Sequence, residues 1–290
     1  MKLGFIGAGK VGTSMGIYLN NYPDISVTGY YSLNPLSAVK AASYTESTAY
    51  DNLPEIVQEA ELIGITTPDD IIIKIVNQLI GLKSNLTDKI IFHTSGVHSS
   101  EILKPLQAKG ATILSIHPML SFGEIIKTEE DLNTTFFTIE GQGKRMDQIY
   151  NLLNGLNNPW LKISLNDKTA YHLAASIVSN YLVTLLDIGI KIFVDIGFTE
   201  KKAKELIQPL LRKTLDNVIE TGTENALTGP IARGDIGTIE KHMDKISQSY
   251  HDILDIYQQL GYKTTDLAKS AGKIDLKTAT KIKEVLKKYE

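Results

Sequence analysis

Cysteine is absent from this chain of 290 residues. Its absence excludes disulfide bonds, thiolate nucleophiles and cysteine-rich zinc sites. It also fits a reducing compartment, so we expect a cytoplasmic protein. The sequence does contain His93, His117, His172 and His242, but they lack the close spacing of common zinc ligands. We therefore expect no metal site.

The chain also lacks an excess of basic residues. Lys and Arg number 30 against 33 Asp and Glu, which gives a formal net charge of -3. Without a positive field or a basic run, nothing in the sequence attracts nucleic acid electrostatically. We expect a small-molecule ligand and no nucleic-acid partner.

Long apolar runs are missing too, because no uninterrupted stretch reaches the roughly 18 residues of a membrane span. The nearest segment, LAASIVSNYLVTLLDIGIKIFVDIG from Leu173, carries two aspartates, a lysine and an asparagine. We interpret it as a long buried helix and expect no membrane association. The apolar start of the chain is broken by glycines and by Lys10. This pattern does not fit an export signal, so we expect these residues in the mature fold.

The first part of the chain alternates between strand and helix patterns. Short runs such as KLGFIG, ELIGITT, KIIFHTSG and ATILSIHP are apolar on both faces, and helical patterns separate them, including one from His98 to Lys109. Such strands are typical of a parallel sheet covered on both sides. The sequence predicts an α/β domain over residues 1–165, with a doubly wound, mainly parallel sheet.

From Thr169 onward only helical periodicity is present. We expect helices over residues 169–196, 199–221, 234–260, 264–270 and 276–289. Gly197, Gly222 and Gly261 stand where these helices would stop. The sequence therefore predicts an all-α domain over residues 166–290, and the length of the chain is sufficient for two domains.

A glycine motif, G-x-G-x-x-G, lies between the first strand and the first helix. Its first glycine permits a tight turn, the second lets a pyrophosphate approach the backbone, and the third lets helix and strand pack closely. Free amides at the helix N-terminus then face the anion. We expect a dinucleotide to contact Gly7, Ala8, Gly9, Lys10, Val11 and Gly12. A tight turn without a ligand is the alternative.

The end of the second strand indicates which dinucleotide binds. NAD-specific sites usually place an acidic residue there to hold the ribose 2′-hydroxyl, and Tyr30-Tyr31-Ser32-Leu33-Asn34 contains none. Ser32 and Asn34 can donate hydrogen bonds to a 2′-phosphate, and Lys40 follows on the next helix, although no arginine follows Ser32. The pattern favours NADP, with NAD as the alternative. These residues are also ordinary loop formers.

Ligands of doubly wound sheets bind over the carboxyl ends of the strands. Two more turns, TTPDD from Thr66 and HTSG from His93, end strands there. We expect cofactor contacts from Thr67, Pro68, Thr94 and Ser95, and substrate contacts from His93 and His117. Thr67 and Asp70 are equally suited to capping a helix. A lone histidine at a strand end often bonds to the backbone instead.

The segment YHLAASIVSNYL contains the best catalytic candidates. His172, Ser176 and Asn180 are spaced four apart, so they share one helix face. An imidazole titrates near pH 6.5, which suits donation of a proton to an atom that gains charge during hydride transfer. The asparagine amide can orient the same substrate. A structural polar strip on an apolar helix is the alternative.

A second polar segment, ALTGPIARGDIGTIEKHM, lies further along the chain. Arg233 offers a planar fork that fits a carboxylate or phosphate, and Asp235 is suited to capping the helix that follows. We expect both to contact substrate. An arginine–aspartate pair beside a capped helix explains the same residues equally well.

Four segments carry a resemblance to a known family: GFIGAGKVGTSM, HTSGVHSSEILKPLQAKGATILSIHPMLSF, YHLAASIVSNYLVTLL and ALTGPIARGD. They resemble the Rossmann-like proteins with a DUF2520 C-terminal domain, over nearly the whole chain. That family is similar to pyrroline-5-carboxylate reductase and the β-hydroxyacid dehydrogenases, in which a helical domain dimerises. The resemblance implies an N-terminal Rossmann domain and a C-terminal domain like that of 6-phosphogluconate dehydrogenase.

The resemblance further implies an NADP-dependent oxidoreductase, and it does not fix the substrate. Two positions depart from the relatives. The β-hydroxyacid dehydrogenases use a catalytic lysine on the first long helix of the second domain, where this chain has His172. Leu33 stands where NADP-binding relatives often have arginine.

Two functional hypotheses follow. In the first, the protein is an oxidoreductase that transfers hydride to or from a small carbonyl or imine in an interdomain cleft, with His172 as general acid. In the second, it senses NADP(H) or a metabolite without turnover, because a fold does not fix a function. The helix from Thr169 is apolar nearly all round, and such a helix must be covered. We therefore expect a homodimer through the helical domain.

Overall fold

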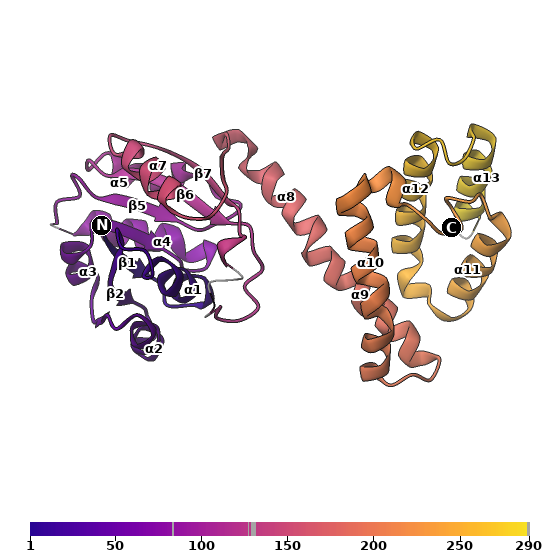
Figure 1. Cartoon of the computed structure of the whole chain (residues 1–290), viewed down its shortest axis with the longest axis horizontal. Helices are drawn as coiled ribbons and strands as arrows, with labels where there is room; N and C mark the ends of the chain where they lie inside the picture. Colours follow the sequence, from indigo (N-terminus) through magenta and orange to yellow (C-terminus); the bar gives the residue numbers. More distant parts are fainter. Residues whose placement is uncertain (83, 127, 129–131, 289–290) are drawn as a thin grey trace. The chain divides into compact units, whose positions relative to one another are not determined.

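The computed structural model describes residues 1–288 apart from 83, 127 and 129–131. Contacts between Cα atoms divide the chain into two compact units, Met1–Tyr181 and Leu182–Glu290. The first unit contains the sheet and the helices around it, and the second is helical (Figure 1). The α/β class and the helical C-terminal part are confirmed. The boundary predicted after residue 165 stays a prediction.

The first unit is built on one sheet of eight strands in the order β3-β2-β1-β4-β5-β6-β7-β8. Neighbours from β3 through β6 are parallel, β7 is antiparallel to β6, and β8 is parallel to β7. The strands are β1 Lys2–Ile6, β2 Ser26–Tyr31, β3 Thr48–Tyr50, β4 Leu62–Ile65, β5 Ile90–His93, β6 Thr112–Pro118, β7 Phe137–Gln142 and β8 Trp160–Lys162. The sheet is therefore mainly parallel, as the sequence predicts.

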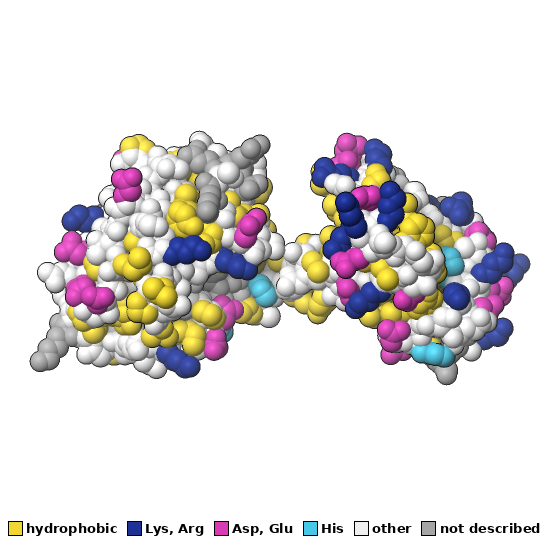
Figure 2. All heavy atoms as spheres, turned by 90° about the horizontal axis from the view of Figure 1, so that it is seen from below, with side chains coloured by type: hydrophobic (Ala, Val, Ile, Leu, Met, Phe, Trp, Pro, Cys, Tyr) yellow, Lys and Arg dark blue, Asp and Glu magenta, His cyan; other side chains and the backbone are white. Residues whose placement is uncertain are grey.

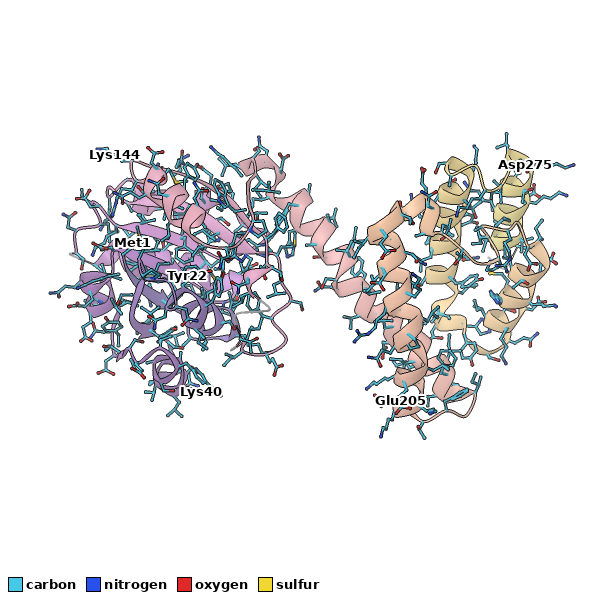
Figure 3. The ribbon with its side chains drawn as sticks, viewed as in Figure 1. Met1, Tyr22, Lys40, Lys144, Glu205 and Asp275 are labelled. Atoms are coloured by element: carbon cyan, nitrogen blue, oxygen red, sulfur yellow. The ribbon has the colours of Figure 1, made fainter. Side chains whose placement is uncertain are left out.

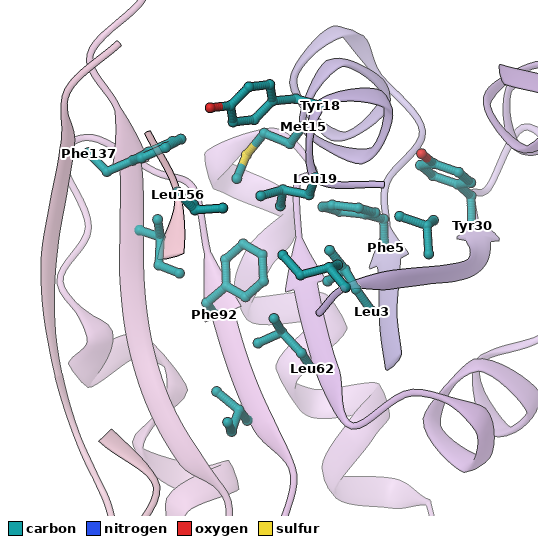
Figure 4. Packing of buried hydrophobic residues seen from close by; sticks show 14 of the residues in the cluster. Leu3, Phe5, Met15, Tyr18, Leu19, Tyr30, Leu62, Phe92, Phe137 and Leu156 are labelled. Carbon is teal, nitrogen blue, oxygen red and sulfur yellow. The ribbon is translucent and has the colours of Figure 1, made fainter. Parts of the chain in front are cut away.

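Helices cover both faces of this sheet, and each face has its own core. The described α-helices of this unit are α1 Lys10–Leu19, α2 Pro35–Thr45, α3 Leu53–Glu59, α4 Asp69–Gly81, α5 Lys104–Gln107, α7 Met146–Gly155 and α8 Lys168–Val178. One core joins strand residues to α1, α2 and α7, and the other joins them to α3, α4 and α5. In the first core Phe5 stacks on Tyr30 with ring centroids 5.5 Å apart (Figure 4).

The first unit also contains elements that the sequence pattern missed. Strand β3 and helices α3 and α7 were not expected. The helix expected from His98 to Lys109 is wrong, because the segment forms a 3₁₀ turn, Ser100–Leu103, followed by the short α5. Pro105 explains this difference, since proline cannot donate the backbone bond that a helix interior requires. It stands in the first turn of α5, where that bond is not needed.

The second unit takes in α9 Asn180–Asp195 except for its first two residues, followed by α10 Glu200–Ala226, α11 Ile236–Ser249, α12 Leu254–Ser270 and α13 Leu276–Lys287. Its core lies between α11, α12 and α13 and includes Ile239, Met243 and Ile282. Gly197 ends α9 with a φ of +106°, which confirms the predicted stop. Gly222, with a φ of +79°, lies at a kink within α10.

The separate helix expected over residues 264–270 is wrong, because these residues form the end of α12. Three further expectations for this part of the chain were also wrong. The helix expected over residues 169–196 is interrupted at Ser179, which separates α8 from α9. The helix expected over residues 234–260 is interrupted between α11 and α12. Gly261 does not stop a helix but lies inside α12, where a β-carbon would meet Cδ1 of Leu286 at 2.8 Å. Close packing against α13 therefore explains this glycine.

The segment interpreted as a long buried helix is exposed within the single chain. Residues Leu165–Asp195 are apolar enough, and as a whole long enough, to cross a membrane, and no part of their most apolar window is buried. Val178, for example, is 71% exposed. The expectation of burial therefore fails for the isolated chain.

Candidate functional site

A first groove of about 370 Å³ opens where β1, β2 and β4 end. Turns after these parallel strands meet at one edge of the sheet, where ligands of doubly wound folds bind. The groove is lined by Ile6, Gly7, Ala8, Gly9, Tyr31, Ser32, Leu33, Asn34, Ser37, Thr66, Thr67, Pro68, Ile71 and Ile75. Seven of the residues predicted from the sequence to bind cofactor lie on this wall.

The glycine motif forms a tight turn that side chains would block. Gly7 has a φ of +109°, and a β-carbon there would lie 2.8 Å from the backbone of Thr66 and Thr67. A β-carbon on Gly12 would lie 2.3 Å from Oγ1 of Thr66, which donates a hydrogen bond to the Gly7 carbonyl at 2.7 Å. Gly9 has open space on its side-chain face. The turn therefore packs on β4 through Gly7 and Gly12 and leaves Gly9 free for a ligand.

Lys10 forms a hydrogen bond with the segment that follows β6 and does not line the first groove. Its Nζ donates to the Gly123 carbonyl at 2.5 Å, and Oγ of Ser14 accepts a hydrogen bond from the Ile126 amide at 2.9 Å. These two bonds fasten the segment after β6 to helix α1. Neither Lys10 nor Val11 nor Gly12 lines the first groove, so their contacts with a cofactor stay predictions.

The wall after β2 combines the polar Ser32, Asn34 and Ser37 with the apolar Leu33, and none of these side chains is charged. Asn34 caps α2, because its Oδ1 accepts the Leu36 amide at 3.1 Å. Ser37, which the sequence analysis missed, lines the groove one turn later. No carboxylate is present among the described residues of this wall. Lys40 lies further along α2 and is exposed (Figure 3).

A second groove of about 420 Å³ lies in the same unit, between the end of β6 and helix α8. It is lined by His117, Met119, Leu120, Ser121, His172, Ala175, Ser176, Val178, Ser179 and Asn180. The three polar residues predicted to share a helix face all line it, although Ser179 interrupts the helix before Asn180. The four-residue spacing thus correctly predicted that these three side chains lie together.

His117 occupies the inner side of this groove. Its Nδ1 lies 2.9 Å from the hydroxyl of Tyr171, and the two rings meet edge to face. Burial, followed by the nearby charges of Lys168 and His172, lowers the pKa of His117 to about 4. The imidazole is therefore uncharged at neutral pH. It can donate a hydrogen bond from one ring nitrogen and accept one at the other.

Gly96 lies beside both histidines of the groove. A β-carbon on Gly96 would lie 2.5 Å from Cδ2 of His172 and 2.9 Å from Nε2 of His117. Any other residue would push the two rings apart. The turn after β5 therefore contributes a close backbone contact at this point.

His93 is buried and bonds to its own turn. Its Nδ1 accepts the Ser95 amide at 3.2 Å, and its Nε2 lies 3.1 Å from the Ser99 carbonyl. Burial is the main cause that lowers its pKa to about 3. His93, Thr94 and Ser95 line neither groove, so their predicted ligand contacts stay predictions.

Lys168 is a residue that the sequence analysis missed. It is the first residue of α8 and is 2% exposed. Its Nζ donates to the Ser95 carbonyl at 2.9 Å and to Oγ of Ser115 at 2.7 Å. It stands four residues before His172 in the sequence, which continues the spacing of the polar strip by one turn. The same four-residue spacing could therefore have identified Lys168 from the sequence.

Arg233 and Asp235 belong to the second unit. Asp235 caps α11, because its Oδ1 accepts the Thr238 amide at 3.1 Å and its Oδ2 accepts the Thr238 hydroxyl at 2.7 Å. These bonds lower the pKa of Asp235. Arg233 is exposed. The capping alternative is therefore observed, and the predicted substrate contact stays a prediction.

Two family models match the chain. Residues 1–118 match a Rossmann-like domain, and residues 135–264 match a domain of unknown function, DUF2520. Both matches confirm the resemblance carried by the four sequence segments. No curated protein matches the chain.

Solved structures share the fold over nearly the full length. A protein from Thermotoga maritima is 26% identical, with a TM-score of 0.70, and the match covers 92% of this chain and 98% of that one. The 1-pyrroline-5-carboxylate reductase of Streptococcus pyogenes is 15% identical, with a TM-score of 0.60 and 98% coverage of both chains. An imine reductase from Myxococcus stipitatus, solved in complex with NADP+, is 14% identical, with a TM-score of 0.62 and coverage of 97% and 99%.

Proposed function

The chain belongs to the family that joins a Rossmann-like domain to a DUF2520 domain, and we propose that it is a nicotinamide-dependent oxidoreductase. The proposal rests above all on the two grooves of the first unit. One is shaped by the glycine turn for a dinucleotide, and the other carries polar groups suited to a small carbonyl or imine. The similar folds of an imine reductase and a pyrroline-5-carboxylate reductase support this assignment.

The first groove fits the pyrophosphate of a dinucleotide. Amides at the N-terminus of α1 have no partner within the helix and favour an anion. The open side of Gly9 leaves room for that anion to approach the backbone. When bound, the nicotinamide ring supplies or accepts the hydride.

We propose NADP(H) as the preferred coenzyme and keep NAD(H) as the alternative. The wall after β2 offers the hydroxyls of Ser32 and Ser37 and the amide of Asn34. A carboxylate there would repel a 2′-phosphate, and no described lining residue carries one. The imine reductase with the same fold was solved with NADP+.

The second groove would bind the substrate. We assign His172 as the general acid, because its imidazole lines the groove and can give a proton to a carbonyl oxygen or imine nitrogen. Asn180 and Ser176 would orient the same substrate through hydrogen bonds, and His117 would contact it from the opposite wall. Arg233 and Asp235 belong to the second unit, so the substrate contacts expected of them stay a prediction.

The experiment combines binding and turnover. Calorimetry with NADPH, NADP+, NADH and NAD+ should show binding, tightest for the two phosphorylated forms. A panel of carbonyls and imines is then followed by the nicotinamide absorbance. His172→Ala should leave NADPH affinity unchanged and lower turnover by about 10²–10⁴-fold, the range typical of acid–base groups.

Other outcomes would change the assignment. Tight NADPH binding without oxidation over the whole panel would support a sensor of NADP(H) instead of an enzyme. Unchanged turnover in His172→Ala would remove the general-acid role from that residue. Absence of heat with all four coenzymes would overturn the proposal as a whole.

We also propose that the helical part joins two copies of the chain. Apolar side chains lie open on α8 and α9, and Leu210 and Ile219 on α10 are 69% and 82% exposed. Figure 2 shows such hydrophobic side chains on the surface among charged ones. A helix that is apolar nearly all round must be covered, and a second copy presents the same apolar face.

A membrane is the other possible cover, and the polar side chains of this segment argue against it. His172 and Ser176 on α8 and Asn180 at the start of α9 line the second groove, and polar groups inside a spanning segment are costly. A cytoplasmic homodimer is therefore our proposal.

A further inference from the structure

Lys168 places a charged group in the interior of the first unit. Its ammonium joins three separate elements: the turn after β5 through the Ser95 carbonyl, β6 through Oγ of Ser115, and α8 through its own backbone. Oγ of Ser115 also lies 3.4 Å from the Ser95 carbonyl, which closes the group into a small network. The function proposed above does not use this lysine.

Burying this charge is costly. Burial is the main cause that lowers the pKa of Lys168 to about 8, while the charges of Glu140 and Asp69 act in the opposite direction. Among the described residues, no carboxylate forms an ion pair with Lys168. Glu140 is instead held by the amide and hydroxyl of Ser100 at 2.5 and 2.7 Å. An apolar side chain would fill this place at lower cost, so the ammonium itself needs an explanation.

Position provides the first part of that explanation. Ser95, whose carbonyl Lys168 holds, directly precedes Gly96, and Gly96 contacts both histidines of the second groove. His172 stands one helical turn after Lys168. The ammonium therefore fixes the backbone next to Gly96 and the start of the helix that carries His172.

Charge provides the second part. Burial and then the charge of Lys168 lower the pKa of His117, and His172 contributes less. Tyr171, the other titratable neighbour, contacts Nδ1 through its hydroxyl, and burial raises its own pKa, so it is uncharged at neutral pH. The same lysine also lowers the pKa of His93.

We propose that Lys168 is a positioning residue of the second groove. Its ammonium locks the Ser95–Gly96 turn between His117 and His172, and its charge adds to burial in disfavouring protonation of His117. This assignment rests on the function proposed above for the role of the histidines. The electrostatic part can be measured without coenzyme or substrate.

The test compares Lys168→Met with Lys168→Arg in the full chain. Met removes the charge and both hydrogen bonds, and Arg keeps the charge. Ring signals of His117 are followed by NMR from pH 8 down to about pH 3, which brackets its lowered pKa, and are assigned with His117→Gln. The pKa of His117 should rise by about one unit in Lys168→Met, since a nearby positive charge that disfavours the protonated imidazole is lost, and should stay near the wild-type value in Lys168→Arg.

Turnover provides a second measurement. In Lys168→Met, kcat should fall by about 10²-fold, the size expected when reacting groups are misplaced, with NADPH affinity unchanged. Lys168→Arg should recover part of the loss. The control is Lys144→Met, which removes an exposed lysine of the same unit (Figure 3) and should alter neither quantity.

If Lys168→Met does not fold, Ser115→Ala removes one of the two hydrogen bonds and keeps the charge. It should lower kcat and leave the His117 titration unchanged. An unchanged titration in a folded Lys168→Met, or an unchanged kcat in Ser115→Ala, would overturn the positioning role. Failure of the wild type to bind any coenzyme would overturn the proposed function and leave the titration result standing.

Discussion

At the residue scale, the glycines of the motif have different physical roles. Gly7 is required by its positive φ, and Gly12 by the approach of Thr66. Gly9 is required by neither, since a β-carbon there would meet no atom within 4 Å. The sequence motif alone does not distinguish the three glycines. The structure shows that Gly7 and Gly12 are needed for the turn to fold, whereas Gly9 leaves space for a ligand.

This difference predicts opposite effects of two alanine substitutions. Gly12→Ala should lower the free energy of unfolding of the first unit by about 1–3 kcal/mol, because the added carbon overpacks the turn. Gly9→Ala should leave that free energy within about 0.5 kcal/mol of wild type and weaken coenzyme binding by about tenfold or more, since its methyl group projects into the groove. Denaturant unfolding and calorimetry measure the two quantities. Wild-type coenzyme affinity in Gly9→Ala would contradict the pyrophosphate assignment.

At the element scale, α12 shows how packing overrides a local stop signal. Glycine commonly ends helices, yet α12 continues through Gly261 to Ser270. The side chain of Leu286 on α13 occupies the space beside this glycine and is fully buried. The residue is glycine because two helices approach closely, which a single-helix pattern does not contain.

Gly261→Ala should therefore destabilise the second unit. Overpacking against Leu286 costs about 1–3 kcal/mol, and the better helix propensity of alanine returns about 1 kcal/mol. A net loss of about 1 kcal/mol is expected in thermal or denaturant unfolding. Gly237→Ala on α11 is the control, since its side-chain face is open, and its stability should match or slightly exceed wild type. A Gly261→Ala variant more stable than wild type would show that the Leu286 side chain can move aside without an energetic cost.

At the scale of the whole molecule, the open apolar surface is the main feature that one chain leaves unexplained. It lies on α8, α9 and α10, and residues such as Val178, Leu210 and Ile219 are largely exposed. Exposed apolar side chains gathered on helices often mark a surface that binds a partner.

Light scattering at micromolar concentration should give twice the 32.0 kDa of one chain. Leu210→Glu and Ile219→Glu should each shift the protein toward the mass of a single chain, because a carboxylate buried in an interface is costly. Lys144→Glu adds a carboxylate in the first unit and should leave the mass unchanged. A wild-type mass of one chain without detergent, together with recovery in the membrane fraction, would favour lipid as the cover instead.

Several features of this protein follow from the sequence itself. Alternating apolar runs predict the doubly wound sheet, and the glycine turn predicts the first groove, because both depend on neighbours along the chain. The four-residue spacing of His172, Ser176 and Asn180 likewise places them on one wall.

Only the tertiary structure decides which polar groups become buried and what surrounds them. It separates the enclosed His93 from His117 at the groove, brings Lys168 to the Ser95 carbonyl, and explains Gly261 by Leu286. Burial and close contact depend on segments far apart in the chain, so they cannot be predicted from local sequence patterns.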